Sequence, residues 1–430
     1  MSPKRKFKQV LSFFLLSSLL ACTEPVEQDT DGEPDSTGDN GTSDQTAIQC
    51  ESHEGCESKV CLDERICENG QNIIYVNGDS NVGGSCGAIE AQCSTIKDAL
   101  SQITSEKSTI HIASGTYSES IVLDGINVFL VGENGAVVQP GTVETDTDVF
   151  AFDIDNGAQV VIDGIQLDGS ENPANPNNVG VRMNNNIPDV WGDEGLITKL
   201  EVNNSRLNKW YGAINLQGYV SLKMVNSNIL DSERAAIFTF IAAEIVLDRV
   251  TTENNSSESF ANDQTTPLAS VLLNLNAPNV YVSNSVFSEP TRSIVSLNPK
   301  EEGETVFVNN TVVYNDFDVN PFRGNPVKCS GEIEANLQNN IIVGRSLTFS
   351  NDLIVNPCPS SNSILSYNSP GENNIWGDPL FVDAANGNFH LRSGSPAIDE
   401  AMPIPDITHD IDGEMRPLGL GPDIGADEAE

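Results

Sequence analysis

The sequence has no apolar run long enough to cross a membrane, and it has few basic residues. Its longest apolar stretch, about a dozen residues near the start of the chain, is shorter than the roughly 20 residues that a transmembrane helix needs. Only 22 Lys and Arg stand against 62 Asp and Glu, which gives a formal charge of −40 over 430 residues. Because such an acidic chain is repelled by nucleic acids and by anionic surfaces, DNA and RNA are excluded as partners.

The first 21 residues have the pattern of a secretory signal. Four basic residues between positions 4 and 8 precede the apolar stretch VLSFFLLSSLLA. The sequence LLAC, which ends at Cys22, resembles the lipobox of bacterial lipoproteins, where the peptide is cleaved before a cysteine that then carries acyl chains such as palmitate. We therefore predict a signal peptide over 1–21 and a lipid anchor at Cys22. The alternative is an ordinary signal peptide beside an unrelated cysteine.

The segment after Cys22 has the composition of a disordered tether. Residues 23–49 hold eight acids, no basic residue and many Gly, Ser, Thr and Pro. As a coil they would span roughly 30 Å on average. Loss of the four positive charges of the signal takes the formal charge of the mature chain from −40 to −44. We predict a linker over 22–49 that holds an extracellular body off the membrane. The resemblance to bacterial lipoproteins implies the outer membrane over the inner one, because position 23 is Thr and not Asp.

The cysteines indicate disulfides formed outside the cytoplasm. Nine are present, and eight remain once Cys22 is assigned to lipid, an even number in an exported protein. Four lie within 18 residues and predict a two-disulfide module over 50–70. Zinc is the alternative, although the spacing lacks the C-x₂-C pairs of zinc sites. From proximity alone, the candidates are Cys50, Cys56, Cys61 and Cys67 in the module, Cys86 with Cys93 at the start of the next domain, and Cys329 with Cys358 around a long loop.

Short β-rich runs recur between residues 71 and 376, separated by Asn, Gly, Asp and Ser. VVIDGIQLDGS, LEVNNSRL and LKMVNSNIL are examples. In the aligned cores the first spacings are 22 and 21 residues, and later spacings are wider, as loop insertions would make them. The aligned residues are Leu207, Ile229, Val250, Val286, Val312 and Ile341, and Ile165 lies about two repeats before Leu207. A period near 21–25 with short strands is typical of a solenoid.

Alternation of apolar and polar residues in these runs favours short strands that cannot fold alone. Stacking each coil on the previous one, at about 4.8 Å per coil, buries a continuous Val, Ile and Leu interior. The Asn-Asn, Asn-Ser and Asn-Gly pairs fall where the chain must turn, and Asn tolerates left-handed backbone angles. We therefore predict an all-β protein, a right-handed parallel β-helix. A β-propeller is the rival architecture, but its blades need about 40 residues and four strands.

Both ends of this region resemble the pectin-lyase-like β-helix superfamily. The opening contains IIYVNGDSNVGGSCG and STIHIASGTYSESIVLDG, with CSTIKDALSQI between them as the expected N-terminal capping helix. The ending resembles that of bacterial surface proteins of the choice-of-anchor Q type, through GDPLFVD, SGSPAIDEA, MRPLG and PDIGADE. The resemblance implies a β-helix over 71–376 and a C-terminal cap segment over 377–430. Members of this family differ in activity, so the fold does not decide the function.

The resemblance raises the question of polysaccharide cleavage, but the expected catalytic motifs are missing from the sequence. Pectate-lyase-like members carry a DH strand motif and an R-x-P-x-x-R segment, and neither occurs here. Polygalacturonase-like hydrolases use Asp-Asp pairs and a Gly-His-Gly. This chain has no adjacent Asp-Asp pair, and none of its four histidines lies between two glycines. These absences favour a protein without catalytic activity.

One cluster nevertheless has the residue types of a sugar site. Aromatic rings pack on the apolar faces of sugars, while basic groups meet carboxylates or hydroxyls. Arg206 and Lys209 lie in one repeat and Arg234 in the next, so we expect them to share a face. The alternative is that the aromatic residues cover a loop and the charges are solvated. The candidate glycan-binding or catalytic residues are Arg182, Trp191, Arg206, Lys209, Trp210, Tyr211 and Arg234.

Two groups of acids have spacings that suit calcium. Asp146, Asp148, Asp153 and Asp155 are two residues apart within each pair, as on one side of a strand. Asp410 and Asp412 lie near Arg416 in the C-terminal segment. A solvated strand face is the alternative for the first group. For the second, the alternative is a cap held by hydrogen bonds and an ion pair.

Two functions remain open from the sequence. The favoured hypothesis is a surface binding or structural protein that contacts extracellular polysaccharide or another envelope component, because lipid anchor, linker and solenoid occur without catalytic motifs. The second hypothesis is a polysaccharide lyase or glycoside hydrolase with a divergent active site. The sequence indicates no cofactor apart from a possible role for calcium.

Overall fold

The structure is a computed structural model. It describes residues 53–61, 67–81, 85–141, 149–170, 178–185, 197–255, 271–289, 293–300, 303–314, 326–330, 335–344, 358–366 and 371–429. The chain divides into two compact units, 1–46 and 47–430, and all the described residues belong to the second. The predicted lipidation site at Cys22 and the predicted linker lie outside the described residues. In the described part, no helix is long and apolar enough to cross a membrane.

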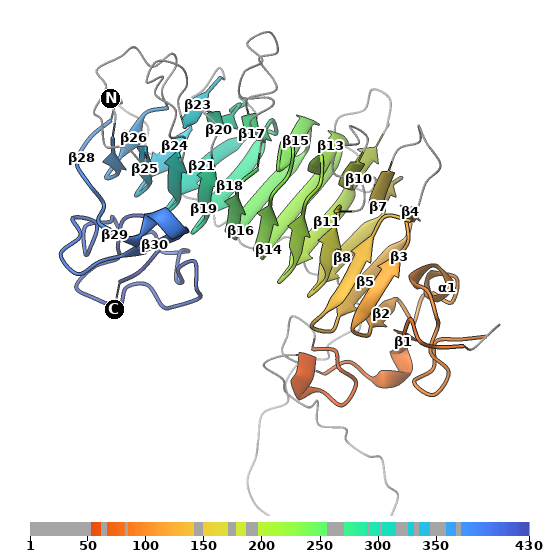
Figure 1. The fold of residues 1–430 in the computed structure, drawn as a ribbon. Helices are drawn as coiled ribbons and strands as arrows, with labels where there is room; N and C mark the ends of the chain where they lie inside the picture. The colour runs from red at the N-terminus through yellow and green to blue at the C-terminus, as the bar shows by residue number, and fades with distance from the viewer. Residues whose placement is uncertain are drawn as a thin grey trace, which may run out of the picture. The chain divides into compact units, whose positions relative to one another are not determined.

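Nearly all the strands belong to two parallel sheets (Figure 1). The larger sheet has 20 described strands, and every pairing in it is parallel. They are β1 Ile73–Val76, β2 Thr109–Ile112, β3 Gly115–Ser118, β5 Asn127–Gly132, β6 Ala136–Gln139, β8 Gln159–Asp163, β9 Gln166–Asp168, β11 Thr198–Asn203, β12 Arg206–Asn208, β14 Val220–Leu230, β16 Glu244–Glu253, β18 Asn279–Ser283, β19 Val286–Glu289, β21 Glu304–Val308, β22 Thr311–Tyr314, β24 Asn336–Gln338, β25 Ile341–Gly344, β26 Ser360–Ser361, β27 Ile364–Leu365 and β28 Ile375–Trp376.

The second sheet has eight described strands in sequence order along the solenoid. They are β4 Ile121–Asp124, β7 Val149–Asp155, β10 Asn178–Asn185, β13 Gly212–Gly218, β15 Ile237–Ile241, β17 Val271–Leu275, β20 Ser293–Leu297 and β23 Val327–Cys329. A small antiparallel pair, β29 Phe381–Asp383 and β30 Asn388–Leu391, stands apart. The helical elements are the 3-10 turns η1 His53–Gly55, η2 Gly70–Asn72 and η4 Ala384–Asn386, and the helix α1 Ile96–Leu100.

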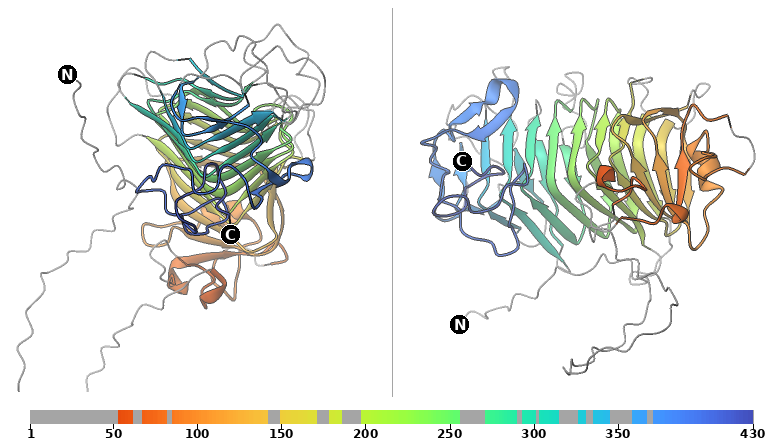
Figure 2. Two further views of the ribbon diagram at one scale, coloured as in Figure 1. Left: turned by 90° about the vertical axis from the view of Figure 1, so that its left-hand side faces the viewer. Right: turned by 90° about the horizontal axis from the view of Figure 1, so that it is seen from below.

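From β2 to β23, each coil crosses the larger sheet twice and the eight-stranded sheet once. The coil made of β11, β12 and β13 pairs with the two halves of β14 and with β15, in parallel and nearly in register. The same order repeats along the unit, and Figure 2 shows the coils side by side. This arrangement is a parallel β-helix and confirms the predicted fold class.

The coils enclose one apolar interior. Leu167, Leu207 and Ile229 stack on one another, and Thr252, Phe287 and Val312 continue the column. The sequence alignment is correct at Leu207, Ile229 and Val312. It is two residues early at Ile165 and Val250, which occupy turn positions, and one residue early at Val286 and Ile341. The strand that contains Leu167 pairs directly with that of Leu207, so the interval predicted as two repeats is a single coil.

A two-residue turn joins the two crossings of the larger sheet, and asparagine dominates its first position. The first residue has a positive φ at Asn204, Asn226, Asn284, Asn309, Asn339, Asn362 and Asn373. Asparagine tolerates this left-handed conformation better than other residues with a side chain, apart from aspartate. Gly164 and Arg249 occupy this position in two other coils, also with a positive φ. The predicted role of asparagine in the turns is therefore confirmed.

The second turn residue points inward and forms a polar ladder between coils. The Asn310 Oδ1 accepts from the backbone N–H of Ser285 at 3.0 Å, and the Asn340 Oδ1 accepts from that of Asn310 at 3.0 Å. Ser363 continues the series by accepting from the N–H of Asn340. Buried backbone groups must be paired, so these side chains allow the chain to turn inside an apolar solenoid.

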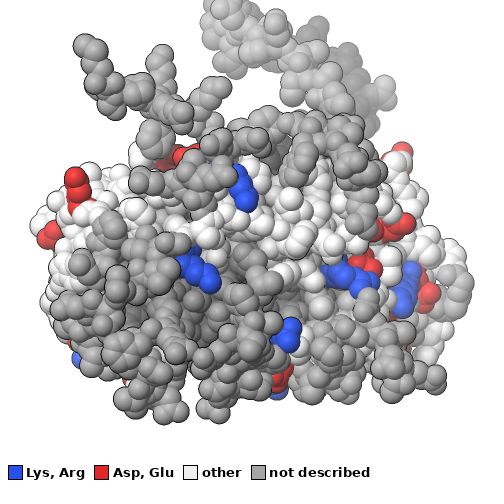
Figure 3. Space-filling model, turned by 90° about the horizontal axis from the view of Figure 1, so that it is seen from above, with Lys and Arg blue, Asp and Glu red and all other residues white. Residues whose placement is uncertain are grey.

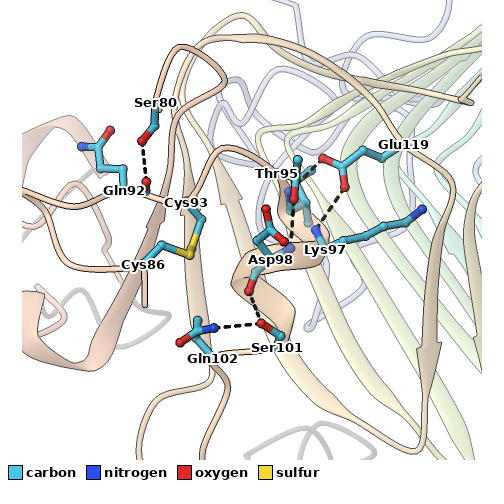
Figure 4. The surroundings of a disulfide bond; sticks show 11 residues. Ser80, Cys86, Gln92, Cys93, Thr95, Lys97, Asp98, Ser101, Gln102 and Glu119 are labelled. Carbon is cyan, nitrogen blue, oxygen red and sulfur yellow. Dashed lines mark hydrogen bonds between the residues drawn. A yellow bond between two sulfur atoms is a disulfide. The ribbon is translucent and has the colours of Figure 1, made fainter. Parts of the chain in front are cut away.

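Helix α1 covers the N-terminal end of the solenoid (Figure 4), and the cysteine-rich module packs on the outer side of the larger sheet. Thr95 caps the helix by accepting from the N–H of Asp98, and the carboxylate of Glu119 accepts from the N–H groups of Ile96 and Lys97 at 2.8 and 3.0 Å. The predicted Cys86–Cys93 disulfide lies beside this helix. The Cys56–Cys67 disulfide closes the module, whose Val60 packs against Ile73 and Tyr75 of β1.

The other cysteines also fit the predicted disulfides. Cys329 at the end of β23 is bonded to Cys358, as predicted from their positions. Cys61 is disulfide-bonded as well, whereas Cys50 lies outside the described residues.

The C-terminal segment folds onto the flank of the solenoid rather than adding a further coil. Val286, Val313 and Ile341 face outward from the larger sheet, and they pack against the segment through Phe381, Phe389 and Leu391. These contacts make a second apolar cluster outside the solenoid wall. Within the segment, Asp410 accepts from the N–H groups of Asp412, Glu414 and Glu428.

Candidate functional site

The outer face of the eight-stranded sheet presents a row of side chains parallel to the solenoid axis. Alternate residues of these strands are buried, so the intervening ones face outward. The row, fixed by the strand register, runs Val122, Asp153, Arg182, Asn215, Phe238, Ser296 and Lys328. With strands about 4.8 Å apart, the eight strands span roughly 34 Å. We refer to this surface as the outer face.

Aromatic side chains lie near the middle of the outer face. Phe240 in β15 is 68% exposed, and Phe238 on the same strand is partly exposed. Phe240 faces outward where the register of β13 and β15 shifts, so that Gln217 is opposite Ile241. The Asn276 Nδ2 donates to the Phe240 carbonyl oxygen at 2.6 Å and fixes the backbone there. An exposed phenylalanine on a rigid strand is a surface on which a sugar ring can pack.

Amide side chains accompany these rings. Asn215 precedes Phe238 in its row, and Gln217 is exposed at the end of β13. Asn276 and Asn298 follow at the edge of the sheet, where Asn298 Nδ2 and Asn276 Oδ1 are 3.0 Å apart. Carboxamides both donate and accept hydrogen bonds, which suits the hydroxyl groups of a glycan. The outer face thus combines apolar platforms with neutral hydrogen-bonding groups.

A guanidinium–carboxylate pair bridges β7 and β10 on the outer face. The Arg182 Nε and Nη2 donate to the two carboxylate oxygens of Asp153 at 2.9 and 2.7 Å. The Arg182 guanidinium also lies 4.9 Å from the ring centroid of Phe150. Because this geometry is bidentate, it orients both groups more firmly than a single contact would.

A second aromatic and basic pair lies at the edge where strands enter the sheet. Tyr211 comes just before β13 and Arg234 shortly before β15. The Arg234 N–H donates to the Tyr211 carbonyl oxygen at 2.8 Å, and its guanidinium lies 4.7 Å from the centroid of the tyrosine ring. These two candidate residues are therefore in contact.

Charges on this side of the molecule are sparse. Figure 3 shows the molecule from above the view of Figure 1, where the labels of the eight-stranded sheet lie along the upper side. Among the described residues visible there, Lys and Arg side chains lie singly in an uncharged surface, and most acids lie toward its margins. Burial lowers the pKa of Lys328, the last residue of the outward row.

The prediction that Trp210 contacts a sugar is wrong. Trp210 is fully buried and its indole Nε1 donates to the Leu167 carbonyl oxygen at 3.2 Å. The ring occupies space left by two glycines of the preceding coil. A Cβ atom at Gly169 would lie 2.7 Å from the indole Cδ2, and one at Gly180 would lie 3.2 Å from it. Trp210 is a core residue.

The remaining predicted basic residues do not form one site. Arg206 is exposed on β12 of the larger sheet, whereas Arg182 lies on β10 of the eight-stranded sheet. Lys209 is exposed and has a φ of 57°, so it turns the chain between β12 and β13. The expected common face for Arg206 and Arg234 is therefore not found, because the two residues belong to different sides of the coil. Trp191 lies outside the described residues.

The described acidic residues of the two predicted calcium sites contact protein groups in the structure. Asp153 is paired with Arg182, and Asp155 accepts from the N–H of Asn156 at 2.7 Å. Asp146 and Asp148 lie outside the described residues. Asp410 is fully buried and holds three backbone N–H groups, so it shapes the C-terminal segment. The carboxylate of Asp412 lies instead beside His390 and Asp427.

Sequence reasoning missed Phe238 and Phe240. They lie in IFTFIAAE, a largely apolar run that is typical of a buried strand. The alternation of Phe with Ile and Thr was the available signal, since it places the two rings on the side opposite Ile237 and Thr239.

Comparison with solved structures finds a similar three-dimensional arrangement in a crystal structure of the pectate lyase Pel9A. The TM-score is 0.48 and the sequence identity 12%, over 83% of this chain and 96% of the lyase chain. No family model and no curated protein sequence matches the chain. The parallel β-helix is established by the strand pairings themselves, and the lyase activity is that of the other protein.

Proposed function

We propose that this protein binds extracellular polysaccharide along the outer face of the eight-stranded sheet, as a lipid-anchored protein of the bacterial outer membrane. The observation that carries the proposal is the exposed Phe240, on the same strand as Phe238, which shares a row parallel to the solenoid axis with Asn215. A polymer needs a long, repetitive surface, and the stacked coils supply one. Arg182 and Lys328 are basic residues of this row, and the neighbouring amides are neutral, so the face suits both neutral and uronate-containing chains.

Replacing Phe240 with alanine is expected to weaken glycan binding roughly tenfold, about 1.4 kcal/mol, because a rigid exposed ring is the kind of residue that dominates a contact surface. The measurement is affinity electrophoresis or titration with the glycan that binds best in a panel of neutral and uronate polysaccharides. Trp376→Ala is the matched control, since this aromatic residue is 48% exposed but lies on β28 of the larger sheet. Equal affinities of the Phe240 variant and the parent would contradict the proposed surface.

Cleavage of the polysaccharide is the second candidate function. The Arg182–Asp153 pair places a guanidinium and a carboxylate side by side on the same face, and such groups serve uronate recognition and proton transfer. Incubation with the same panel distinguishes the two functions. A lyase generates an unsaturated product that absorbs in the ultraviolet, and a hydrolase generates new reducing ends. Binding without either product supports the first proposal.

The anchor is tested by replacing Cys22 with serine. We expect the variant to lose labelling by palmitate and to leave the membrane fraction, because stable anchoring needs more than one acyl chain and these are attached at that cysteine. Cys61→Ser is unsuitable as a control because Cys61 is disulfide-bonded. A better control is Ser36→Ala in the predicted linker, which should remain labelled and membrane-bound. Palmitate labelling that survives in the Cys22 variant would refute the anchor.

A further inference from the structure

Three potential metal ligands converge in the C-terminal segment. The His390 Nδ1 lies 2.7 Å from the Asp427 Oδ1 and 3.6 Å from the Asp412 Oδ2. All three ligand atoms lie within 4.8 Å of one another. Ligands of a tetrahedral zinc ion, each at about 2.0–2.1 Å from the metal, are roughly 3.4 Å apart. Small side-chain adjustments would therefore bring these three atoms around one ion.

The ligands come from three separate stretches of chain that hydrogen bonds tie to one another. His390 lies on β30, and the N–H of its neighbour Leu391 donates to the Asp427 Oδ2 at 2.7 Å. This bond leaves the Asp427 Oδ1 directed at His390. The backbone N–H of Asp412 donates to the buried Asp410. The arrangement is therefore already organised before a ligand binds.

The cluster lines a cavity rather than a flat surface. This cavity has a volume of about 150 Å³ and lies between the C-terminal segment and the solenoid. His390, Asp412 and Asp427 form part of its wall, and Thr251 and Thr311 of the larger sheet form another part. The side chains of His390 and Asp412 are about half exposed, 49% and 50%, which leaves a path from solvent. The cluster therefore combines three potential ligands with space for an ion and access from solvent.

We propose that His390, Asp412 and Asp427 bind a divalent transition-metal ion, for which Zn²⁺ is the test ion. Imidazole together with carboxylates suits zinc and its neighbours, whereas calcium prefers a shell made only of oxygen atoms. Three protein ligands leave a further coordination position for water. The ion would tie β30 to the segments around Asp412 and Asp427, and so hold the C-terminal segment together on the flank of the solenoid.

The test is isothermal titration of the chelator-stripped full chain with ZnCl₂. We expect one ion per chain, and a loss of affinity of at least roughly tenfold in His390→Ala and in Asp412→Asn, since each removes one of three ligands. Both residues are half exposed, so the variants should fold, which circular dichroism checks. His409→Ala is the matched control, because His409 is an exposed histidine of the same segment bonded to Thr408. Its affinity should equal that of the parent.

Three results would overturn the site. They are no binding of Zn²⁺ by the parent, equal binding by the parent and both ligand variants, and a loss of binding in His409→Ala alone. Titration with CaCl₂ tests the choice of metal. Calcium that binds as tightly as zinc would contradict the inference from the imidazole ligand.

Discussion

Replacing Arg416 with alanine is expected to destabilise the C-terminal segment by about 3–5 kcal/mol, because removal of one partner leaves buried charge without compensation. The Arg416 Nη1 donates to the Glu428 Oε2 at 2.8 Å, and both side chains are 1% exposed. The guanidinium also donates to the carbonyl oxygens of Asp423, Gly425 and Asp427. Its loss would remove the positive charge beside the buried Glu428, which would keep only the N–H groups of Leu418 and Asp423 as donors, and the three carbonyl groups would lose the guanidinium.

The measurement is hydrogen exchange and limited proteolysis of the Arg416 variant, with attention to residues 378–429. Faster exchange there, with the solenoid strands unchanged, is the expected pattern, since the segment packs on the outside of the wall. Arg392→Ala is the matched control, because this exposed arginine of the same segment makes a hydrogen bond to the Val382 carbonyl oxygen. Protection in the Arg416 variant equal to that in the control would show that the ion pair is not needed.

Glu289 is expected to make the solenoid less stable as the pH rises from 4.5 to 8. This side chain is fully buried at the end of β19, and its carboxyl group faces the N–H and Nδ2 groups of Asn255 at 2.7 and 2.9 Å. Burial raises its pKa from 4.5 to about 8, against the hydrogen bonds from Asn255, which favour the charged form. The folded chain therefore holds a proton that the unfolded chain has already released.

The solenoid loses stability as the pH rises because the folded chain binds one more proton than the unfolded chain. Between the two pKa values, each pH unit costs about 1.4 kcal/mol of folding free energy. This slope falls by half at pH 8, so the loss from pH 6 to pH 8 is about 2 kcal/mol. Below pH 4.5 both states are protonated and the contribution is fully present. Glu289→Gln removes the titration and should flatten the decline in unfolding midpoint between pH 6 and pH 9. Glu372→Gln, at an exposed acid, should keep the parent's slope. Parallel declines in the parent and in Glu289→Gln would contradict this account.

The solenoid could be predicted because its determinants repeat. Each coil brings inward aliphatic residues and an asparagine turn, so an error of one or two residues, as at Val250, does not change the architecture. The disulfides at Cys86–Cys93 and Cys329–Cys358 followed from proximity because each joins residues close in sequence or around a single loop. Because the same local pattern recurs in many coils, an error in one coil has little effect on the prediction of the fold.

The site was harder to predict because it depends on the direction of single side chains. Trp210 follows a residue with a positive φ, where strand alternation is interrupted, and only the glycines of the preceding coil make room for it inside. Arg206 and Arg182 fall on different sheets because the coil turns between them. The cluster of His390 with Asp412 and Asp427 joins residues up to 37 positions apart, through a segment without repeats.

The proposed glycan surface is tested most directly by a crystal structure of the chain with a bound oligosaccharide from the best-binding polysaccharide. The account predicts sugar rings along the outer face of the eight-stranded sheet, parallel to the solenoid axis, with one ring packed on Phe240 and hydroxyl groups on Asn215 or Gln217. An oligosaccharide bound instead on the larger sheet or on the C-terminal segment, with Phe240 uncontacted, would contradict it.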